Sequence, residues 1–195
     1  MNKIMKKLLQ GLLLSLAIGG AAHAEKADST KPTQIEADQG LFDEVKQSRT
    51  LTGNVVLMRG TLLMKAGRAL VTEDPQGYQF VTFWAAPGAL ATFRQKRDGP
   101  GDLWVEGQAE RVEYNNKTEV VKLFSKAKLT RLQGDKPTDQ VEGAYISYEG
   151  RKEVFTVNNQ DDGGSKKGAG RVKMVIQPTA PTPASSATPA KAPAP

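Results

Sequence analysis

Cysteine is absent from this 195-residue chain, and histidine occurs once, at position 23. Without cysteine the chain has no disulfide bond, no zinc–thiolate site and no thiol nucleophile. Because His23 lies in a segment that we expect to be removed, the mature chain also lacks the commonest general acid and base of enzymes. Only chemistry based on carboxylates, serine or lysine would remain. We therefore expect no enzymatic activity, no catalytic residue, no metal site and no cofactor.

An excess of positive charge is also absent from the body of the chain. The formal net charge is +6, but Lys3, Lys6 and Lys7 contribute three of the 27 basic residues at the very N-terminus. Residues 34–158 contain 17 basic and 17 acidic residues. A nucleic-acid-binding surface needs basic residues concentrated on one face of a domain. We therefore expect no nucleic acid partner.

Residues 1–24 have the pattern of a secretory signal peptide. The three lysines precede an apolar run at residues 8–18, and Ala22-His23-Ala24 fits a cleavage site of the A-x-A type. A membrane anchor is the alternative, but this run is shorter than the roughly 20 residues that span a bilayer. We therefore expect an exported protein that is cleaved after Ala24.

Composition divides the rest of the chain into three parts, a short lead at residues 25–32, one domain at residues 33–157 and a tail at residues 158–195. The domain is long enough to bury a core. The tail is polar and rich in glycine, then rich in proline and alanine, so it lacks the apolar residues that would offset the entropy of ordering. We expect it to be disordered, although residues 172–176 have the pattern of a short strand.

Alternation of apolar and polar residues is the dominant pattern of the domain. It is clearest at residues 51–72, where it runs from Leu51 to Leu57, breaks at Arg59-Gly60 and resumes at Leu62. A period of two residues is typical of β-strands, and the break is typical of a hairpin turn. Weaker versions of the pattern begin near residues 35, 105 and 141. The sequence predicts an all-β domain of stacked hairpins, with an exposed loop at residues 95–102.

One face of these strands is apolar and the other is charged, as Lys122, Lys126 and Lys128 illustrate between apolar neighbours. The apolar face either packs as an ordinary sandwich core or lines a trough that holds lipid, and sequence parity alone does not distinguish these two cases. The residues predicted to line such a trough are Ile35, Leu51, Val55, Leu57, Leu62, Met64, Leu70, Phe93, Val105, Val112, Tyr114, Val121, Leu123 and Leu129.

Five short stretches, in this order behind a signal peptide, resemble one known family. They are TQIEAD at 33–38, LTGNV at 51–55, KAGRALV at 65–71, ATF at 91–93 and VEG at 105–107. Together with the Pro/Ala-rich tail they resemble the LptA/OstA-like family, the periplasmic bridge proteins of the lipopolysaccharide transport system. The resemblance implies a twisted, partly open β-jellyroll with an apolar interior, in which Phe93 and Tyr114 match positions near the open seam.

The resemblance also implies a function and partners. The implied function is a non-enzymatic carrier in the periplasm that binds lipopolysaccharide through its acyl chains and bridges the inner and outer membranes. The N-terminal edge, at residues 35–42, would meet an inner-membrane-anchored transport component. The C-terminal edge, at residues 141–157, would meet the outer-membrane translocon. Copies of the chain would associate head to tail through the same edges.

Two other functions fit the β pattern. In a carbohydrate-active or polysaccharide-binding protein, Trp84 and Trp104 would stack on sugars, and Asp98, Asp102 and Glu106 would supply a pair of carboxylates. In a structural filament protein the same fold would assemble without a ligand. Turnover of polysaccharide would indicate the first, whereas only lipid binding separates a carrier from a filament.

Overall fold

The structure is a computed structural model that describes residues 28–178. The expected signal peptide and the end of the tail after residue 178 lie outside the described residues. No helix within residues 28–178 is long and apolar enough to cross a bilayer. One 3-10 turn, η1 (Gly150–Lys152), interrupts a succession of strands. The strands are β1 (Gln34–Glu36), β2 (Gln39–Asp43), β3 (Ser48–Arg59), β4 (Leu62–Glu73), β5 (Gln79–Trp84), β6 (Ala91–Lys96), β7 (Leu103–Ala109), β8 (Arg111–Asn115), β9 (Val120–Gln133), β10 (Lys136–Glu149), β11 (Val154–Asn158) and β12 (Lys173–Ile176).

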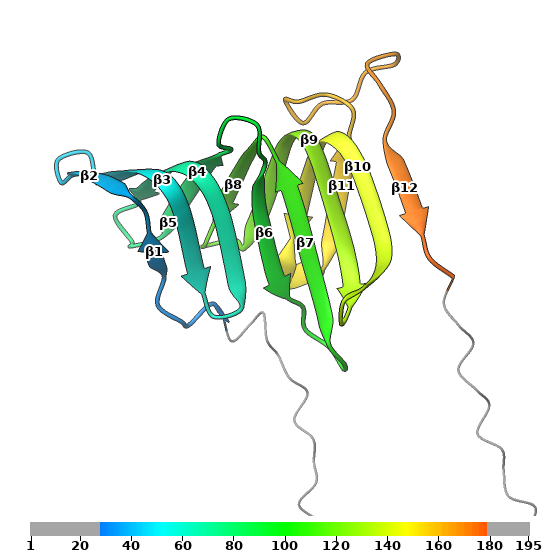
Figure 1. The fold of residues 1–195 in the computed structure, drawn as a ribbon, viewed down its shortest axis with the longest axis horizontal. Coiled ribbons are helices and arrows are strands. Elements are labelled where there is room, and N and C mark those ends of the chain that lie inside the picture. The colour runs from blue at the N-terminus through cyan, green and yellow to red at the C-terminus, as the bar shows by residue number, and fades with distance from the viewer. Residues whose placement is uncertain (1–27, 179–195) are drawn as a thin grey trace, which may run out of the picture.

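These strands form one antiparallel 12-stranded sheet that folds over into two layers (Figure 1). The long strands β3, β4, β9 and β10 run through both layers. One half of β3 pairs with β1 and the other half with β2, and β9 divides in the same way between β7 and β8. We call the layer with β1, β6, β7 and β12 the first layer and that with β2, β5, β8 and β11 the second layer. The all-β jellyroll of stacked hairpins predicted from the sequence is confirmed.

A β-bulge bends each of the long strands β3 and β9. Gly53 and Asn54 have φ angles of 80° and 45°, and Ser125 and Lys126 have φ angles of 61° and 54°. In each case two bulged residues face a single residue of the partner strand, Gly67 or Ala144. Such a bulge kinks a strand and increases its twist. The bulges therefore let one strand serve both layers.

The chain supports both bulges with the same type of contact. The backbone N–H of Asp38 donates to the carbonyl of Gly53 at 3.0 Å, and that of Glu110 donates to the carbonyl of Ser125 at 3.0 Å. The side chains of these residues also contact the bulges. Asn54 donates a hydrogen bond to the carboxylate of Asp38 at 2.9 Å, and Lys126 forms an ion pair with Glu110 at 2.7 Å. The fold is thus built from two similar halves, which the sequence shows only as a weak recurrence.

The two layers join along one side of the molecule, which we call the spine. The bulges lie there, and so do the crossings from β1 to β2, from β5 to β6 and from β7 to β8. On the opposite side, which we call the mouth, the strands end in turns. The turns of the first layer, including those after β3 and β6, follow the lower edge of Figure 1. Among residues 28–178, no strand connects the layers at the mouth.

Between the layers lies one apolar cluster. Its members are at most 8% exposed, and the largest include Tyr148, Phe83 and Phe93. They come from alternate positions of strands in both layers, as the period of two requires.

Leu70 is a correction to the inner face predicted from the sequence. Leu62 and Met64 point inward at the start of β4, but after Gly67 the inward positions are Ala69 and Val71. The bulge opposite Gly67 changes the parity of the strand, so Leu70 is half-buried on the outer face. A Cβ at Gly67 would lie 2.7 Å from the Cα of Ala86, so this close backbone approach requires glycine.

Two segments differ in extent from the sequence prediction. β6 continues to Lys96, and Gln95 is buried at 7% exposure, so the connection is confined to residues 97–102, of which only residues 100–102 are exposed. At the C-terminus β11 and β12 both pair with β10, one in each layer. The strand predicted to begin the C-terminal edge at residue 141 is therefore covered, and within the described residues β11 and β12 form this edge.

Candidate functional site

The apolar interior is filled by side chains of the protein itself. Phe93 in β6 lies over Gly107 in β7, where an added Cβ would be only 2.1 Å from the ring. The same ring stacks on Tyr148 with centroids 6.5 Å apart and an interplanar angle of 24°. Phe93 thus links the first layer to Tyr148 of the second layer, where β10 pairs with β9 and β11. Any guest in this interior would have to displace such contacts.

The inner positions of the first layer change from apolar to cationic toward the mouth. Arg59 is the last residue of β3, Arg131 lies two residues before the end of β9, and Arg97 directly follows β6. The deeper inner positions of the same strands are Leu57, Phe93 and Leu129. The inner face of the first layer is therefore apolar at depth and carries guanidinium groups at the mouth. We call Arg59, Arg97 and Arg131 the cationic lip.

The cationic lip contacts the second layer and holds the mouth closed. Arg59 donates from Nη1 to the hydroxyl of Tyr114 in β8 at 3.4 Å. Arg97 pairs through Nη2 with the carboxylate of Glu153 at 2.6 Å, and Arg131 donates from Nη2 to the carbonyl of Glu153 at 2.7 Å. Glu153 ends the turn between β10 and β11 with a φ angle of 53°. The layers are thus bridged by polar contacts at the mouth and by continuous backbone at the spine.

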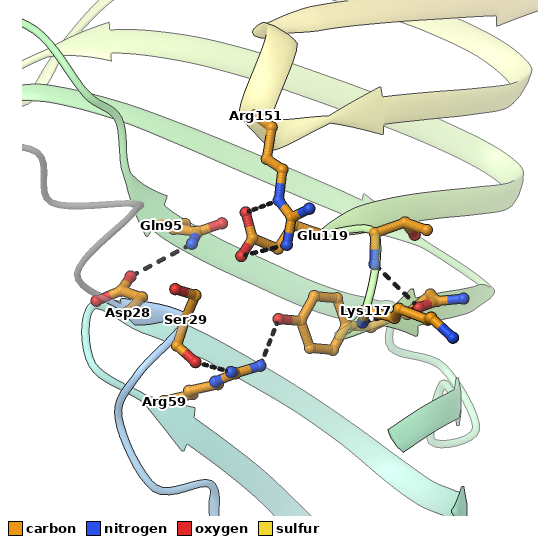
Figure 2. A network of polar contacts seen from close by, with 10 residues as sticks. Asp28, Ser29, Arg59, Gln95, Lys117, Glu119 and Arg151 are labelled. Carbon is orange, nitrogen blue, oxygen red and sulfur yellow. Dashed lines mark hydrogen bonds and ion pairs between the residues drawn. The ribbon is translucent and has the colours of Figure 1, made fainter. Parts of the chain in front are cut away.

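A polar network surrounds the Arg59 end of the mouth (Figure 2). Glu119, only 8% exposed, accepts two hydrogen bonds from Arg151, at 3.0 Å and 3.3 Å. Burial raises the pKa of the Tyr114 hydroxyl above its ordinary value of 10.0, while the neighbouring charge of Arg59 acts in the opposite direction. Tyr114 is therefore neutral at physiological pH and accepts a hydrogen bond from Arg59.

The first described residues fasten the N-terminal segment to the same place. Asp28, 5% exposed, accepts hydrogen bonds from the backbone N–H of Thr61 at 2.8 Å and from its hydroxyl at 2.6 Å. Gln95 donates to the same carboxylate at 3.3 Å, and the carbonyl of Ser29 accepts a bond from Arg59. Figure 2 shows Asp28 and Ser29 beside Arg59. Asp28 thus connects Thr61, in the turn after β3, with Gln95 in β6.

Most of the trough residues predicted from the sequence lie together. All except Leu70 belong to the apolar cluster or, like Ile35, pack against it. Their contact with lipid remains a prediction. Sequence reasoning missed the cationic lip, although a signal exists, because Arg59 and Arg131 fall at inner positions that continue an apolar run. Arg59 follows Val55 and Leu57 at the same parity, for example.

Of the residues of the carbohydrate alternative, Asp102, Trp104 and Glu106 lie near one another at β7, whereas Trp84 ends β5 in the other layer. Asp102 accepts a bond from the indole N–H of Trp104 at 2.9 Å and pairs with Lys96 at 3.3 Å. Glu106 pairs with Arg94, whose guanidinium also lies over the ring of Trp104 at 4.5 Å. Asp102 and Glu106 are therefore each paired with a cation. This arrangement does not support a sugar-stacking Trp104 beside a pair of catalytic carboxylates.

Comparison with known proteins identifies the family. The sequence profile described as LptA/(LptD N-terminal domain) LPS transport protein matches residues 34–154, from the start of β1 to the start of β11. The chain belongs to this family. The resemblance seen in the sequence is thereby confirmed, and the matched span contains both bulges, the apolar cluster and the cationic lip.

Two relatives of this LptA-like chain match over most of their length. It is 28% identical to the lipopolysaccharide export system protein LptA of Haemophilus influenzae over 177 residues, 89% of this chain and 95% of that protein. It is 30% identical to the protein of the same name from Escherichia coli K12 over 155 residues, 80% of each chain.

A solved structure shows the same fold. It is the crystal structure of LptH from Pseudomonas aeruginosa, described as the LptA homologous periplasmic component of the conserved lipopolysaccharide transport device. The TM-score is 0.66 at 22% identity, and the match covers 77% of this chain and 99% of the crystallised chain. The LptA-like jellyroll therefore extends over the described domain.

Proposed function

We propose that this LptA-like chain is a non-enzymatic periplasmic carrier that holds the acyl chains of lipopolysaccharide between its two layers. The observation that carries the proposal is the apolar cluster, which lies between two layers that the backbone of residues 28–178 joins only at the spine. The family is one of lipopolysaccharide transport proteins, and its relatives include LptA and LptH.

Burial of hydrocarbon is sufficient to explain transport without chemistry. Moving one CH₂ group out of water lowers the free energy by about 0.8 kcal/mol. An acyl chain of about a dozen carbons in water therefore faces a barrier on the order of 10 kcal/mol. An apolar interior lowers this barrier, and the sugars remain outside in water. Because Phe93 and its neighbours fill the interior, loading requires the layers to part.

The mouth is the side on which the layers part at least cost. The Arg59–Tyr114 and Arg97–Glu153 contacts are polar, and water replaces such contacts when they break. Parting at the spine would instead break strands that continue from one layer to the other. Acyl chains would therefore enter between the cationic lip and the turns of the second layer.

The two ends of the jellyroll fit a head-to-tail bridge. Among residues 28–178, β1 and β2 pair only with β3, and β11 and β12 pair only with β10, so each end has unpaired strand edges in both layers. Exposed apolar residues lie at both ends, including Leu41 at 69%, Phe42 at 60% and Ile176 at 67%. Such edges extend a sheet by β-augmentation.

In the bridge, the β1 and β2 end would meet the inner-membrane-anchored component and the β11 and β12 end the outer-membrane translocon. Further copies of the chain would fill the interval, so that the bridge spans the periplasm. A continuous apolar interior through stacked copies would then carry lipopolysaccharide from the inner to the outer membrane.

Photo-crosslinking in living cells tests the carrier function. A photoreactive amino acid at Phe93 or Tyr114, both on inner faces, is expected to form adducts with lipopolysaccharide. The same amino acid at Thr92 or Glu113, the neighbouring outer-face positions of β6 and β8, is the matched control. Absence of adducts at Phe93, Tyr114 and every other inner-face position would contradict the proposal.

A further inference from the structure

The cationic lip stands at the boundary between hydrocarbon and water. Arg59 is 8% exposed and lies two residues after the buried Leu57. The side chain of Arg97 is 12% exposed and lies four residues after the buried Phe93. An amphipathic ligand whose acyl chains lie beside Leu57 and Phe93 would place its headgroup at this height. The structure thus presents guanidinium groups where a headgroup would emerge.

These arginines have donors in reserve. The Nε–H groups of Arg59, Arg97 and Arg131 are buried, and none has an acceptor among residues 28–178. Their other contacts use terminal nitrogens, such as the Nη2 atoms that bind Glu153. A guanidinium presents donors in a planar fork that matches the oxygens of a phosphate. The Nε–H side of each guanidinium is therefore suited to an oxyanion that brings several acceptors.

The opposite side of the mouth carries the complementary charge. Glu153 faces Arg97 from the second layer, and Glu119, on the same side, is paired with Arg151. When the layers part, Glu119 keeps its partner, because both residues belong to turns of the second layer. Glu153, in contrast, loses its contacts with Arg97 and Arg131 at the same time. Opening thus exposes guanidinium groups of the first layer.

From this arrangement we propose that the cationic lip is a binding site for the phosphate groups of a lipid headgroup. The inference rests on the proposed function, because the phosphate is that of the lipid whose acyl chains occupy the interior. Glu153 acts as the internal competitor: it neutralises Arg97 in the closed state and gives way to phosphate in the loaded state. Specificity for a phosphorylated lipid would then come from Arg97 and Arg131, and hydrocarbon burial would supply the rest of the affinity.

A simple latch makes a different prediction from a phosphate site. If the Arg97–Glu153 pair only holds the mouth closed, removing either partner opens the mouth and shifts the affinity for every lipid in the same direction. If Arg97 binds phosphate, removing Arg97 weakens binding of phosphorylated lipid, whereas removing the charge of Glu153 strengthens it. The two partners of one ion pair therefore have opposite effects only at a phosphate site.

The experiment measures binding of fluorescently labelled lipid A to the exported mature chain by fluorescence anisotropy. The probes are phosphorylated lipid A and the same lipid after phosphatase treatment, both dispersed in the same detergent. The wild-type chain is expected to prefer the phosphorylated probe by about tenfold, the contribution of one charge-assisted hydrogen bond. Binding of inorganic phosphate is measured in parallel.

Two variants and one control complete the test. Arg97→Gln combined with Arg131→Gln is expected to abolish the preference while retaining affinity for the dephosphorylated probe. Glu153→Gln is expected to increase the preference. Arg94→Gln, which removes an arginine from the outer face of β6, the strand just before Arg97, is expected to change neither the affinity nor the preference. Circular dichroism and denaturant unfolding establish that each variant is folded.

Several results would overturn the inference. Equal binding of the two probes by the wild-type chain would do so, and tight binding of inorganic phosphate combined with such equality would assign the lip to free phosphate instead. If the combined Arg97→Gln and Arg131→Gln variant and the Glu153→Gln variant shifted the affinity for both probes in the same direction, the lip would be only a latch. If the wild-type chain bound neither probe, the proposed carrier function itself would fail, which is a different outcome from loss of phosphate preference alone.

Discussion

Replacing Gly107 with alanine tests whether the interior is filled when no lipid is bound. The new Cβ would lie 2.1 Å from Cε1 of Phe93 and 3.0 Å from Cδ1 of Leu123. Real Cβ atoms do not approach that closely, so the ring of Phe93 must move, and it stacks on Tyr148. Overpacking a close-packed core costs about 1–3 kcal/mol. We expect Gly107→Ala to lower the free energy of unfolding by that amount.

A double-mutant cycle assigns the cost to the contact. Phe93→Leu removes Cε1, the atom that clashes most, so Gly107→Ala should cost less in that background, with a coupling of about 1 kcal/mol or more. Urea unfolding followed by two probes measures each variant. Gln108→Ala, the adjacent position that faces outward, is the control and should stay within about 0.5 kcal/mol. A neutral Gly107→Ala would refute a filled interior, since Phe93 would then have room to swing away.

Three further predictions address the register, the mouth and the ends. Leu57→Ala should cost about 2–5 kcal/mol and Leu70→Ala about 1 kcal/mol or less, because only Leu57 faces the cluster; equal costs in urea unfolding would contradict the parity change at Gly67. Stability should fall as the pH rises above about 10, because the raised pKa of Tyr114 makes the folded state bind more protons in that range; Tyr114→Phe should reduce this slope, and an unchanged slope would assign it elsewhere. Phe42→Asp should weaken self-association in concentration-dependent scattering without lowering stability, and unchanged association would exclude the β2 edge.

The sequence predicts the strands because their cause is local. Apolar residues at every second position bury one face of a strand whatever the topology, so the inner positions of β3 and β9 follow directly from their parity. The same reasoning fails at Leu70, because a bulge changes parity without any local requirement in β4. Gly53-Asn54 signals such a bulge through its tolerance of positive φ, but Ser125-Lys126 adopts the same conformation with no glycine. That second bulge depends on the contact with Glu110, which is not local.

The mouth is hidden from the sequence for a similar reason. Arg59, Arg97 and Arg131 are far apart in the chain, and nothing local in the sequence indicates that they lie together. Only the folding of one sheet into two layers brings them to one side, opposite Glu153. The candidate trough is thus predictable from periodicity and resemblance, whereas the groups that close it depend on the topology.

The most direct test of the central claim is to lock the mouth and measure lipid loading. Because the chain has no cysteine, the combined variant Arg97→Cys and Glu153→Cys carries two thiols, one on each layer, which a short bismaleimide can join. The unlinked variant serves as the control, since it lacks the same ion pair. We predict that the unlinked protein takes up lipopolysaccharide and that the cross-linked protein does not. Equal uptake by both forms would contradict entry between the two layers at the mouth.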